Sequence, residues 1–509
     1  MKRLLLLFLL CAVGMIHSSF DVRPSIVSPV STDPVVPTLL APYLDDAACR
    51  RWVDSIMDKL SLKQKVGQLL IYTIAPKRDK ANRNLLHKVI KEYHVGGLLF
   101  SGGQLANQAI LTNEAQQLSK VPLLMTFDGE WGLAMRLKQL PAFPKNMVLG
   151  CIQDDSLLYA YGREVARQCK ELGVQVNFAP VADVNVNPKN PVINVRSFGA
   201  GADLVARKVT AYAQGLESGG VLSVCKHFPG HGDTETDSHK ALPLLSFDRD
   251  RLDSIELYPF RKAIAAGLGG MMVGHLEVPV IESTSGLPSS LSRNVVYELL
   301  TRELQFQGLI FTDALNMKGA QGCQSICLRA LKAGNDLLLV PRRLKEEMEA
   351  VMAAIKSGEL PEELIDEKCR KVLTYKYALG LHQKPHIRLS GLEQRLVTPA
   401  THQLIRRLEQ AAVTVLGNRE GLLPLDADAG QPALLYVGKE ASIAPLLKHL
   451  PQEVHPALFS LPALPTAQDM SQLADTLSSY RRLLVVVNEQ SLPAYRTFFS
   501  QHLPDVPTV

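Results

Sequence analysis

The chain has 509 residues, of which 46% are hydrophobic and 21% charged, a balance typical of a folded globular protein. This length is enough for two or three domains. The formal net charge of +5 is small for such a length, and the sequence has no block of Lys and Arg and no aromatic residues interleaved with basic ones. Composition therefore excludes a disordered chain and argues against a nucleic-acid-binding protein.

The first segment, residues 1–19, has the pattern of a secretory signal peptide. Lys2 and Arg3 precede an apolar run from Leu4 to Ile16, and this run of about 13 residues is too short to cross a membrane. Cys11 lies early in the run and follows Leu10, not the small residue that lipidation favours. We expect an exported protein, periplasmic or extracellular, with no transmembrane segment in the mature chain.

Residues 45–385 alternate short apolar runs with amphipathic stretches. The runs that indicate buried strands are Gln68–Thr73, Val95–Phe100, Pro122–Asp128, Val174–Val181, Val221–His227, Gly269–Leu276, Gly308–Asp313 and Asp336–Pro341. The stretches between them include Ala81–His94, Gly103–Leu118, Ser156–Leu172, Asp203–Ser218, Asp248–Ala266 and Arg293–Leu304. Strands that are each followed by a crossover of helical length predict an α/β fold, a (β/α)8 TIM-type barrel. A doubly wound open sheet is the alternative.

The rest of the chain predicts a linker and a second domain. Residues 386–405 are polar and weakly periodic, which indicates a linker. In residues 406–509, the apolar runs Ala411–Leu416, Pro432–Val437 and Arg482–Val487 indicate strands, and Leu473–Tyr480 indicates a helix. This pattern predicts a small α/β sandwich-like domain. It looks incomplete, because roughly 100 residues are few for a sheet with helices on both faces.

The stretch from Lys226 to His239 reads Lys-His-Phe-Pro-Gly-His-Gly-Asp-Thr-Glu-Thr-Asp-Ser-His. It follows the apolar run Val221–Cys225, as a loop does where a buried parallel strand ends. Active sites of α/β barrels and open sheets are built at that end of their strands. A solvated surface loop is the alternative, but three imidazoles in one such loop argue against it.

Other polar residues also follow predicted strands. They are Asp128, Arg196, His275 and Asp313, besides Lys226 and His227. A lone aspartate at a strand end often caps the next helix. Several polar residues on one face of a barrel are harder to explain as caps, so we expect them to meet in one site.

These residue types suit the cleavage of a glycosidic bond. Asp313 would attack the anomeric carbon or stabilise an oxocarbenium-like transition state. In an extended segment Asp237 and His239 would face the same side, so Asp237 could orient the imidazole, which titrates near pH 6.5 and can give and take a proton. Metal binding by His227 and His231 is the alternative. The Pro-Gly pair between them prevents a shared helical face, so we expect no metal and no cofactor.

From about residue 48 to 380 the sequence resembles glycoside hydrolase family 3, specifically its bacterial β-N-acetylglucosaminidases (β-hexosaminidases), and more weakly through Ala411–Leu425. The resemblance rests on the stretch Lys226–His239, on Leu287–Ser292 and on Gly308–Met317. It implies a retaining exo-β-N-acetylglucosaminidase with Asp313 as nucleophile and His239 as general acid/base, paired with Asp237. The same resemblance implies that the sugar is held by Asp128, Arg136, Arg196, Lys226 and His227.

The implied substrate is a carbohydrate with a terminal, non-reducing β-linked N-acetylglucosamine, from peptidoglycan fragments, as in peptidoglycan recycling, or from chitin oligomers. Trp131 and Leu133 depart from the Asp-x-Glu-Gly-Gly segment of this subgroup, which bears on the side that holds the leaving group. Three alternatives stay open. They are a β-N-acetylglucosaminide phosphorylase, because a neutral imidazole repels phosphate less than a carboxylate does, a non-catalytic cell-wall sugar-binding barrel, and a metal-dependent amidohydrolase-type barrel.

Overall fold

The computed structural model describes residues 34–238, 240–320, 324–416, 430–450, 454–488, 491–502 and 508. The predicted leader, residues 1–19, and His239 lie outside these ranges. The chain divides between Val413 and Thr414 into two compact units, and each is described by itself. None of the described helices is long and apolar enough to cross a membrane.

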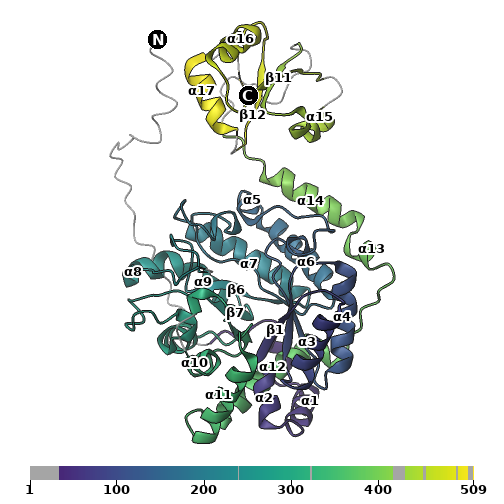
Figure 1. Cartoon of the computed structure of the whole chain (residues 1–509), viewed down its shortest axis with the longest axis vertical. Coiled ribbons are helices and arrows are strands. Elements are labelled where there is room, and N and C mark those ends of the chain that lie inside the picture. Colours follow the sequence, from purple (N-terminus) through teal and green to yellow (C-terminus); the bar gives the residue numbers. More distant parts are fainter. Residues whose placement is uncertain are drawn as a thin grey trace. The chain divides into compact units, whose positions relative to one another are not determined.

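Parallel strands form the centre of the first unit (Figure 1). They are β1 (Leu70–Ile74), β2 (Gly97–Phe100), β3 (Leu124–Phe127), β4 (Val176–Asn177), β5 (Leu222–Ser223) with its continuation β6 (Cys225–Phe228), β7 (Gly270–Val273), β8 (Leu309–Thr312) and β9 (Leu338–Leu339). Six of them pair in the order β5-β4-β3-β2-β1-β9 and three in the order β6-β7-β8. The bridges Val181–Lys226 and Phe311–Leu337 join these two sheets at both ends, so the strands close into a ring. The (β/α)8 barrel is confirmed, and the open-sheet alternative is wrong.

The order of the ring places two functional strands opposite each other. From β3 to β8 there are four steps through β4, β5/β6 and β7, and four steps through β2, β1 and β9. Strand β6 lies midway between them on one side. Groups at the carboxyl ends of β3 and β8 therefore face each other across the mouth of the barrel.

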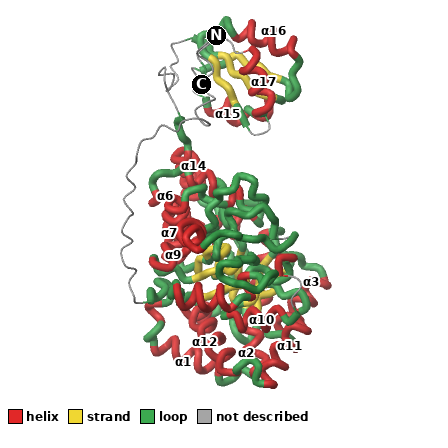
Figure 2. The backbone as a smooth tube through the Cα atoms, turned by 90° about the vertical axis from the view of Figure 1, so that its left-hand side faces the viewer, coloured by secondary structure: helices red, strands yellow, loops and turns green. Residues whose placement is uncertain are grey.

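Helices surround this ring (Figure 2). The α-helices are α1 (Ala47–Met57), α2 (Leu62–Gln68), α3 (Lys80–Lys91), α4 (Leu105–Leu118), α5 (Asn146–Gly150), α6 (Asp155–Glu171), α7 (Ala202–Ser218), α8 (Arg249–Arg251), α9 (Tyr258–Ala265), α10 (Ile326–Ala333), α11 (Leu344–Ser357) and α12 (Glu362–Ala378). Two segments wind as π-helices, η4 (Leu252–Glu256) and η6 (Asn294–Glu303). Short 3-10 turns are η1 (Ala41–Tyr43), η2 (Leu133–Met135), η3 (Asn194–Arg196), η5 (Ser289–Leu291), η7 (Lys318–Ala320) and η8 (Leu381–Gln383).

Local sequence explains where several helices begin. Ser61 and Gln64 form a capping box at α2, in which each side chain accepts a hydrogen bond from the other residue's backbone N–H. Asp79 accepts from the N–H of Asn82 at the start of α3. Each such cap stabilises a helix by about 1 kcal/mol. The buried apolar side chains of α3, such as Val89, then lie on one face and pack toward the strands.

The predicted linker, residues 386–405, is wrong. It contains α13 (Leu392–Leu396) and most of α14 (Pro399–Ala412), which belong to the first unit. Arg167 of α6 donates to the carbonyl oxygen of Leu396 at 2.8 Å, and Leu396 and Leu408 are buried. A narrow buried stripe is enough to fix a helix on the barrel, and the many polar residues around it hid that stripe in the sequence.

The second unit is a small parallel sheet with helices. Its strands β10 (Ala433–Val437), β11 (Ala457–Leu461) and β12 (Leu483–Val486) pair in the order β11-β10-β12. Its helices are α15 (Ala444–His449), α16 (Ala467–Leu477) and α17 (Leu492–His502), with a 3-10 turn η10 (Glu440–Ser442). The strand predicted at Ala411–Leu416 is wrong, because its first two residues complete α14 and the following four are exposed without regular structure. The sequence prediction also missed β11, whose residues alternate between half-buried and exposed up to the buried Leu461.

Candidate active site

A cavity of about 290 Å³ opens at the carboxyl ends of the barrel strands. Its floor is apolar and includes Phe178 and Met272, and the ring of Phe178 meets that of Phe311 edge-on, with centroids 5.5 Å apart. Its volume is at the lower end of the range for small-ligand sites. Six of the predicted site residues line it together: Asp128, Arg136, Arg196, Lys226, His227 and Asp313. Their positions agree with a single site, and their individual roles remain predictions.

Asp128 and Glu130, which follow β3, are bound by cations from other parts of the ring. Lys226 in β6 donates to Asp128 Oδ1 at 2.6 Å, and its Nζ lies 2.8 Å from Glu130 Oε1. Arg136 pairs with Asp128 Oδ2. Arg196 in η3 makes a bidentate pair with Glu130, at 2.9 and 2.7 Å. Bidentate, charge-assisted bonds of this kind fix both partners in one geometry.

This network decides the protonation of its members. Burial raises the pKa of Asp128, but Lys226 and Arg136 lower it more, so the carboxyl titrates well below its usual range. Burial also raises the pKa of Glu130, but the positive charges of Lys226 and Arg196 lower it more, so this pKa too lies below its ordinary value. Burial lowers the pKa of Lys226, but the two carboxylates raise it more. At neutral pH the network therefore consists of ions, and Asp128, Lys226, Arg136 and Arg196, which line the cavity, can each form a charge-assisted hydrogen bond with a sugar hydroxyl.

A second buried carboxylate, Asp183, organises the loop that follows β6. Asp183 Oδ2 lies 2.7 Å from His227 Nδ1, and Asp183 Oδ1 accepts from the backbone N–H of His231 at 2.7 Å. His227 Nε2 is thereby turned toward Arg196 Nη2, 3.3 Å away. Burial raises the pKa of Asp183, but the neighbouring His227 and His231 lower it more, so the group stays ionised. Asp183 acts on the cavity through His227, as a positioning residue.

His231 anchors the far end of the same loop. Its Nδ1 lies 2.7 Å from Thr234 Oγ1 and its Nε2 lies 3.0 Å from Ser238 Oγ. Burial lowers the pKa of His231 to about 4, so the ring is neutral at pH 7, with one nitrogen to donate and one to accept. The carbonyl oxygen of Ser238 also accepts from the N–H of Gly319 at 3.1 Å. Because Gly319 follows β8, this bond joins the loop after β6 to the segment that carries Asp313.

The predicted acid/base pair is only partly described. His239 lies outside the described residues. Asp237 does not lie in the extended segment that we expected, because its carbonyl oxygen accepts from the N–H groups of Lys240 and Ala241, at 2.8 and 3.0 Å, and closes a turn. The roles of Asp237 and His239 stay predictions from the family resemblance.

Asp313 ends β8 on the opposite side of the mouth from Asp128. Its Oδ1 accepts from the backbone N–H of Ala314 at 2.7 Å. Burial raises the pKa of Asp313, but His275, His227 and that N–H lower it more, so the pKa lies below its ordinary value. His275 does not line the cavity. Its Nδ1 lies 2.7 Å from Ser290 Oγ and its Nε2 lies 3.1 Å from the carbonyl oxygen of Ala314, which supports the segment that holds Asp313.

The sequence prediction missed Glu130, Asp183 and the anchoring function of His231. Glu130 stands two residues after Asp128, and Asp183 follows the apolar run that contains β4, so both carry the same strand-end signal that identified the other residues. In the described ranges, no group of three or more His, Cys, Asp and Glu side chains is placed to hold a metal ion.

Residues 61–375 match the model of the glycosyl hydrolase family 3 N terminal domain. The chain belongs to this family. Among family 3 relatives, beta-hexosaminidase A of Pseudoalteromonas piscicida is 32% identical over 394 residues, which are 70% of this chain and 65% of that protein. Beta-hexosaminidase LpqI of Mycobacterium tuberculosis is 33% identical over 333 residues, which are 62% of this chain and 83% of that protein. The chain thus spans just under two thirds of the first relative and most of the second.

Two solved structures share the architecture of this chain. A family 3 beta-N-acetylglucosaminidase from Paenibacillus sp. str. FPU-7 has a TM-score of 0.72 and 33% identity, and the match covers 88% of this chain and 89% of that one. A beta-glucoside phosphorylase, BglX, has a TM-score of 0.75 at 23% identity over 92% of this chain. The second likeness is one of fold alone.

Proposed function

We propose that this family 3 protein is a retaining exo-β-N-acetylglucosaminidase, which releases terminal non-reducing N-acetylglucosamine. The observation that carries the proposal is the cavity at the barrel mouth, where the carboxylate of Asp313 faces an ionised network around Asp128 and Lys226. The cavity has room for a small ligand, which suits a single terminal sugar. The names of the relatives, beta-hexosaminidases and a beta-N-acetylglucosaminidase, agree with this substrate class.

In the proposed reaction Asp313 is the nucleophile. Its lowered pKa keeps the carboxylate ionised, and the hydrogen bond from the Ala314 N–H leaves its other oxygen, Oδ2, available for attack. Attack on the anomeric carbon forms a glycosyl ester as the bond to the leaving group breaks, and water then hydrolyses the ester with net retention. The apolar floor below the sugar lowers the local dielectric and strengthens the charges that stabilise the oxocarbenium-like transition state.

The network on the opposite wall holds the sugar. Asp128 and the imidazole Nε2 of His227 can accept hydrogen bonds from ring hydroxyls, and Lys226, Arg136 and Arg196 can donate them. A site built to pair with hydroxyls rejects ligands that lack them, because its charged groups would be left unpaired. His239, oriented by Asp237, protonates the departing oxygen in the first step and activates water in the second.

The proposal extends to location and substrate source. The leader-like residues 1–19 support export to the periplasm or beyond, where peptidoglycan fragments and chitin oligomers occur. In that location the enzyme would hydrolyse muropeptide disaccharides, as a step in the recycling of the cell wall.

The test is turnover of an aryl N-acetylglucosaminide by the wild type and by Asp313→Ala. We expect loss of turnover in the variant, with the β-anomer as first product of the wild type by proton NMR. Activity within tenfold of wild type in Asp313→Ala, or an α-anomer as first product, overturns the proposal. Product analysis with and without phosphate decides the phosphorylase alternative, since a sugar 1-phosphate forms only in phosphorolysis.

A further inference from the structure

Asn190, in the loop that follows β4, joins two parts of the molecule through its side-chain amide. The residue is buried. Its Oδ1 accepts from the backbone N–H groups of Val192 and Ile193, at 2.9 and 2.8 Å. Its Nδ2 donates to the backbone carbonyl oxygens of His231 and Gly232, at 2.8 and 3.1 Å. Two N–H groups on one side and two carbonyls on the other allow one orientation of the amide, and they engage both of its ends.

The oxygen end of this amide supports Arg196. Because Pro191 follows, the backbone at Asn190 is held away from the helical region, and an Asn-Pro pair readily starts a turn over the next backbone N–H groups. The N–H of Ile193 and the carbonyl of Val192 belong to one peptide group. Asn190 binds that N–H, and Arg196 Nη1 donates to that carbonyl oxygen at 3.3 Å. The N–H of Arg196 also donates to the carbonyl oxygen of Ile193, at 2.7 Å. Asn190 therefore fixes the turn from which the guanidinium reaches the cavity.

The nitrogen end holds the loop after β6. Besides its two carbonyl partners, Nδ2 of Asn190 lies 3.4 Å from Thr234 Oγ1. Thr234 Oγ1 lies 2.7 Å from His231 Nδ1, and His231 Nε2 lies 3.0 Å from Ser238 Oγ. Contacts thus run without interruption from Asn190 to Ser238, which precedes His239 in the chain. Without the amide nitrogen two buried carbonyls would lose this donor, which favours a different path of the loop.

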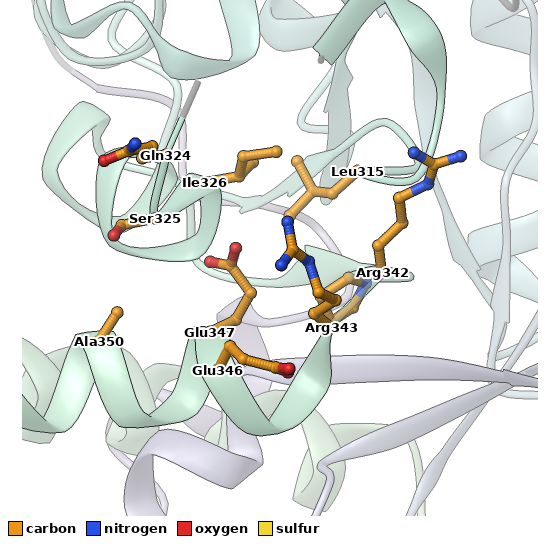
Figure 3. Close-up of a pocket in the computed structure, with 10 residues that line it drawn as sticks. Leu315, Gln324, Ser325, Ile326, Arg342, Arg343, Glu346, Glu347 and Ala350 are labelled. Carbon is orange, nitrogen blue, oxygen red and sulfur yellow. The ribbon is translucent and has the colours of Figure 1, made fainter. Parts of the chain in front are cut away.

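Both ends act on the active-site cavity. Four residues that these bonds connect line it: Val192, Arg196, His231 and Ser238. Asn190 itself does not line it, so it acts through its partners. Figure 3 shows a larger cavity, of about 480 Å³, which is lined by residues between Leu315 and Ala350. Asn190 and the residues that it binds, all of which the structure describes, are not among them, so Asn190 concerns the active-site cavity and not this one.

We propose that Asn190 is a positioning residue that fixes Arg196 with its amide oxygen and the loop from His231 to Ser238 with its amide nitrogen. This proposal rests on the proposed glycosidase function, in which Arg196 holds the sugar and His239 is the general acid/base. The oxygen end should then affect the affinity for the sugar. The nitrogen end should affect the protonation of the leaving group, because the loop that it holds leads into His239.

Two variants separate the two ends. Asn190→Ala removes both, whereas Thr234→Val keeps Asn190 and removes the hydroxyl that links its nitrogen to the His231 ring. The first readout is the ratio of kcat/KM for an activated aryl N-acetylglucosaminide to that for chitobiose, whose departing sugar needs a proton. The second readout is the Kd for N-acetylglucosamine, measured by calorimetry.

Loss of one buried hydrogen bond corresponds to a change of about tenfold, so Asn190→Ala should raise both the ratio and the Kd by about this factor. Thr234→Val should raise the ratio and leave the Kd unchanged. An unchanged ratio in Asn190→Ala, or an unchanged Kd in that variant, overturns the proposal. A Kd that rises equally in both variants also overturns it, because the two ends then have no separate effects. If Asn190→Ala does not fold, Thr234→Val still decides, since an unchanged ratio in that variant overturns the proposal.

Asn113→Ala is the matched control. Asn113 in α4 is also buried, and its side chain joins two segments in the same way. Its Nδ2 donates to the carbonyl oxygen of Ile387 and its Oδ1 accepts from the N–H of that residue, both at 2.9 Å. Asn113 does not line the active-site cavity. Tm should fall in Asn113→Ala as in Asn190→Ala, but the ratio and the Kd should keep their wild-type values. Equal changes of both readouts in Asn113→Ala indicate a general effect of lost stability and overturn the proposal.

Failure of the glycosidase proposal would be visible separately. A wild type that hydrolyses no N-acetylglucosaminide refutes the proposed function. Hydrogen exchange then tests Asn190 without a reaction. The backbone amides of residues 230–238 should exchange about tenfold faster in Asn190→Ala than in the wild type or in Asn113→Ala, because the loop opens more readily. Equal exchange in the three proteins overturns the positioning function.

Discussion

Replacement of Lys226 by Met separates what the ionised network does for the fold from what it does for the site. The side chain of Lys226 is 4% exposed and contacts Asp128 and Glu130 at 2.6 and 2.8 Å. Methionine has a similar length but no charge, so the substitution removes both contacts with little change of volume. Each carboxylate keeps an arginine, Arg136 for Asp128 and Arg196 for Glu130.

The expected loss of stability follows from these contacts. Removal of one partner from a buried ion pair costs about 3–5 kcal/mol, and because both carboxylates keep an arginine we expect the lower end, about 3 kcal/mol. A unit of roughly 380 residues has an unfolding entropy of about 0.8 kcal/mol per kelvin, so Tm should fall by about 4 °C. Loss of the charged donor should also lower kcat/KM by about a hundredfold.

Lys208→Met is the control. Lys208 in α7 is equally buried and pairs with Asp155 Oδ1 at 2.5 Å, but it does not line the catalytic cavity. Calorimetry should show a similar fall of Tm in both variants, and aryl N-acetylglucosaminide turnover should be lost only in Lys226→Met. The pH at which the protein loses stability on acidification should be higher for Lys226→Met than for the wild type. Lys226 helps to hold the pKa values of Asp128 and Glu130 down, and that stabilisation is present above their unfolded pKa values and is lost as the pH falls.

The reasoning is refuted if Lys226→Met keeps kcat/KM within fivefold of the Lys208→Met value, since Lys226 then has no function at the sugar. It is also refuted if Tm is unchanged in Lys226→Met, because the network then contributes no net stability to the barrel.

Three further predictions concern His239 and His231 in the loop after β6, and the buried Glu217 in α7. His239→Ala should lower turnover more for glycosides with poor leaving groups than for activated aryl ones, because only the former need protonation; equal losses would contradict the acid role. His231→Phe should show the same split to a smaller degree, because Ser238 loses the 3.0 Å contact that anchors the loop; an unchanged ratio between the two leaving groups would mean that His231 serves the fold alone. Burial raises the pKa of Glu217 to about 7, so the folded state binds a proton more tightly than the unfolded state and stability falls as pH rises from about 4.5 to 7, by at most about 3 kcal/mol. Urea unfolding of Glu217→Gln should lack this fall, and parallel pH curves for variant and wild type would refute the prediction.

The barrel could be predicted because each strand is a short apolar run buried by helices, a signal that does not depend on distant residues. Asp128, Arg196, Lys226, His227 and Asp313 could be predicted for a related reason, since strand ends of a parallel barrel meet at one face. Arg136 was implied only by the family resemblance. The functions of Glu130 and Asp183 could not be predicted in this way. Their partners, Arg196 and His227, come from other strands, and only the folded ring brings each carboxylate to its cation.

The errors have local causes. The stretch 386–405 has the polar composition of a linker, yet a few buried side chains fix α13 and α14 on the barrel. At Ala411–Leu416 an apolar run of strand length contains the end of a helix, and periodicity cannot separate these two in so short a segment. The turn that begins at Asp237 is closed by backbone hydrogen bonds, which leave no pattern in the side chains, so the sequence does not reveal it.

The position of β3 opposite β8 in the ring has a mechanical consequence. Neighbouring strands keep a spacing of about 4.8 Å that their hydrogen bonds enforce, but no such bond fixes the width of the barrel. If the circular cross-section flattens along the axis through β3 and β8, Asp313 approaches the sugar held by Asp128, and flattening at right angles to this axis moves it away. Substitutions in the layers of side chains that fill the barrel can therefore tune the distance of nucleophilic attack without touching the substrate. Selection for altered rates should find such positions deep below the mouth.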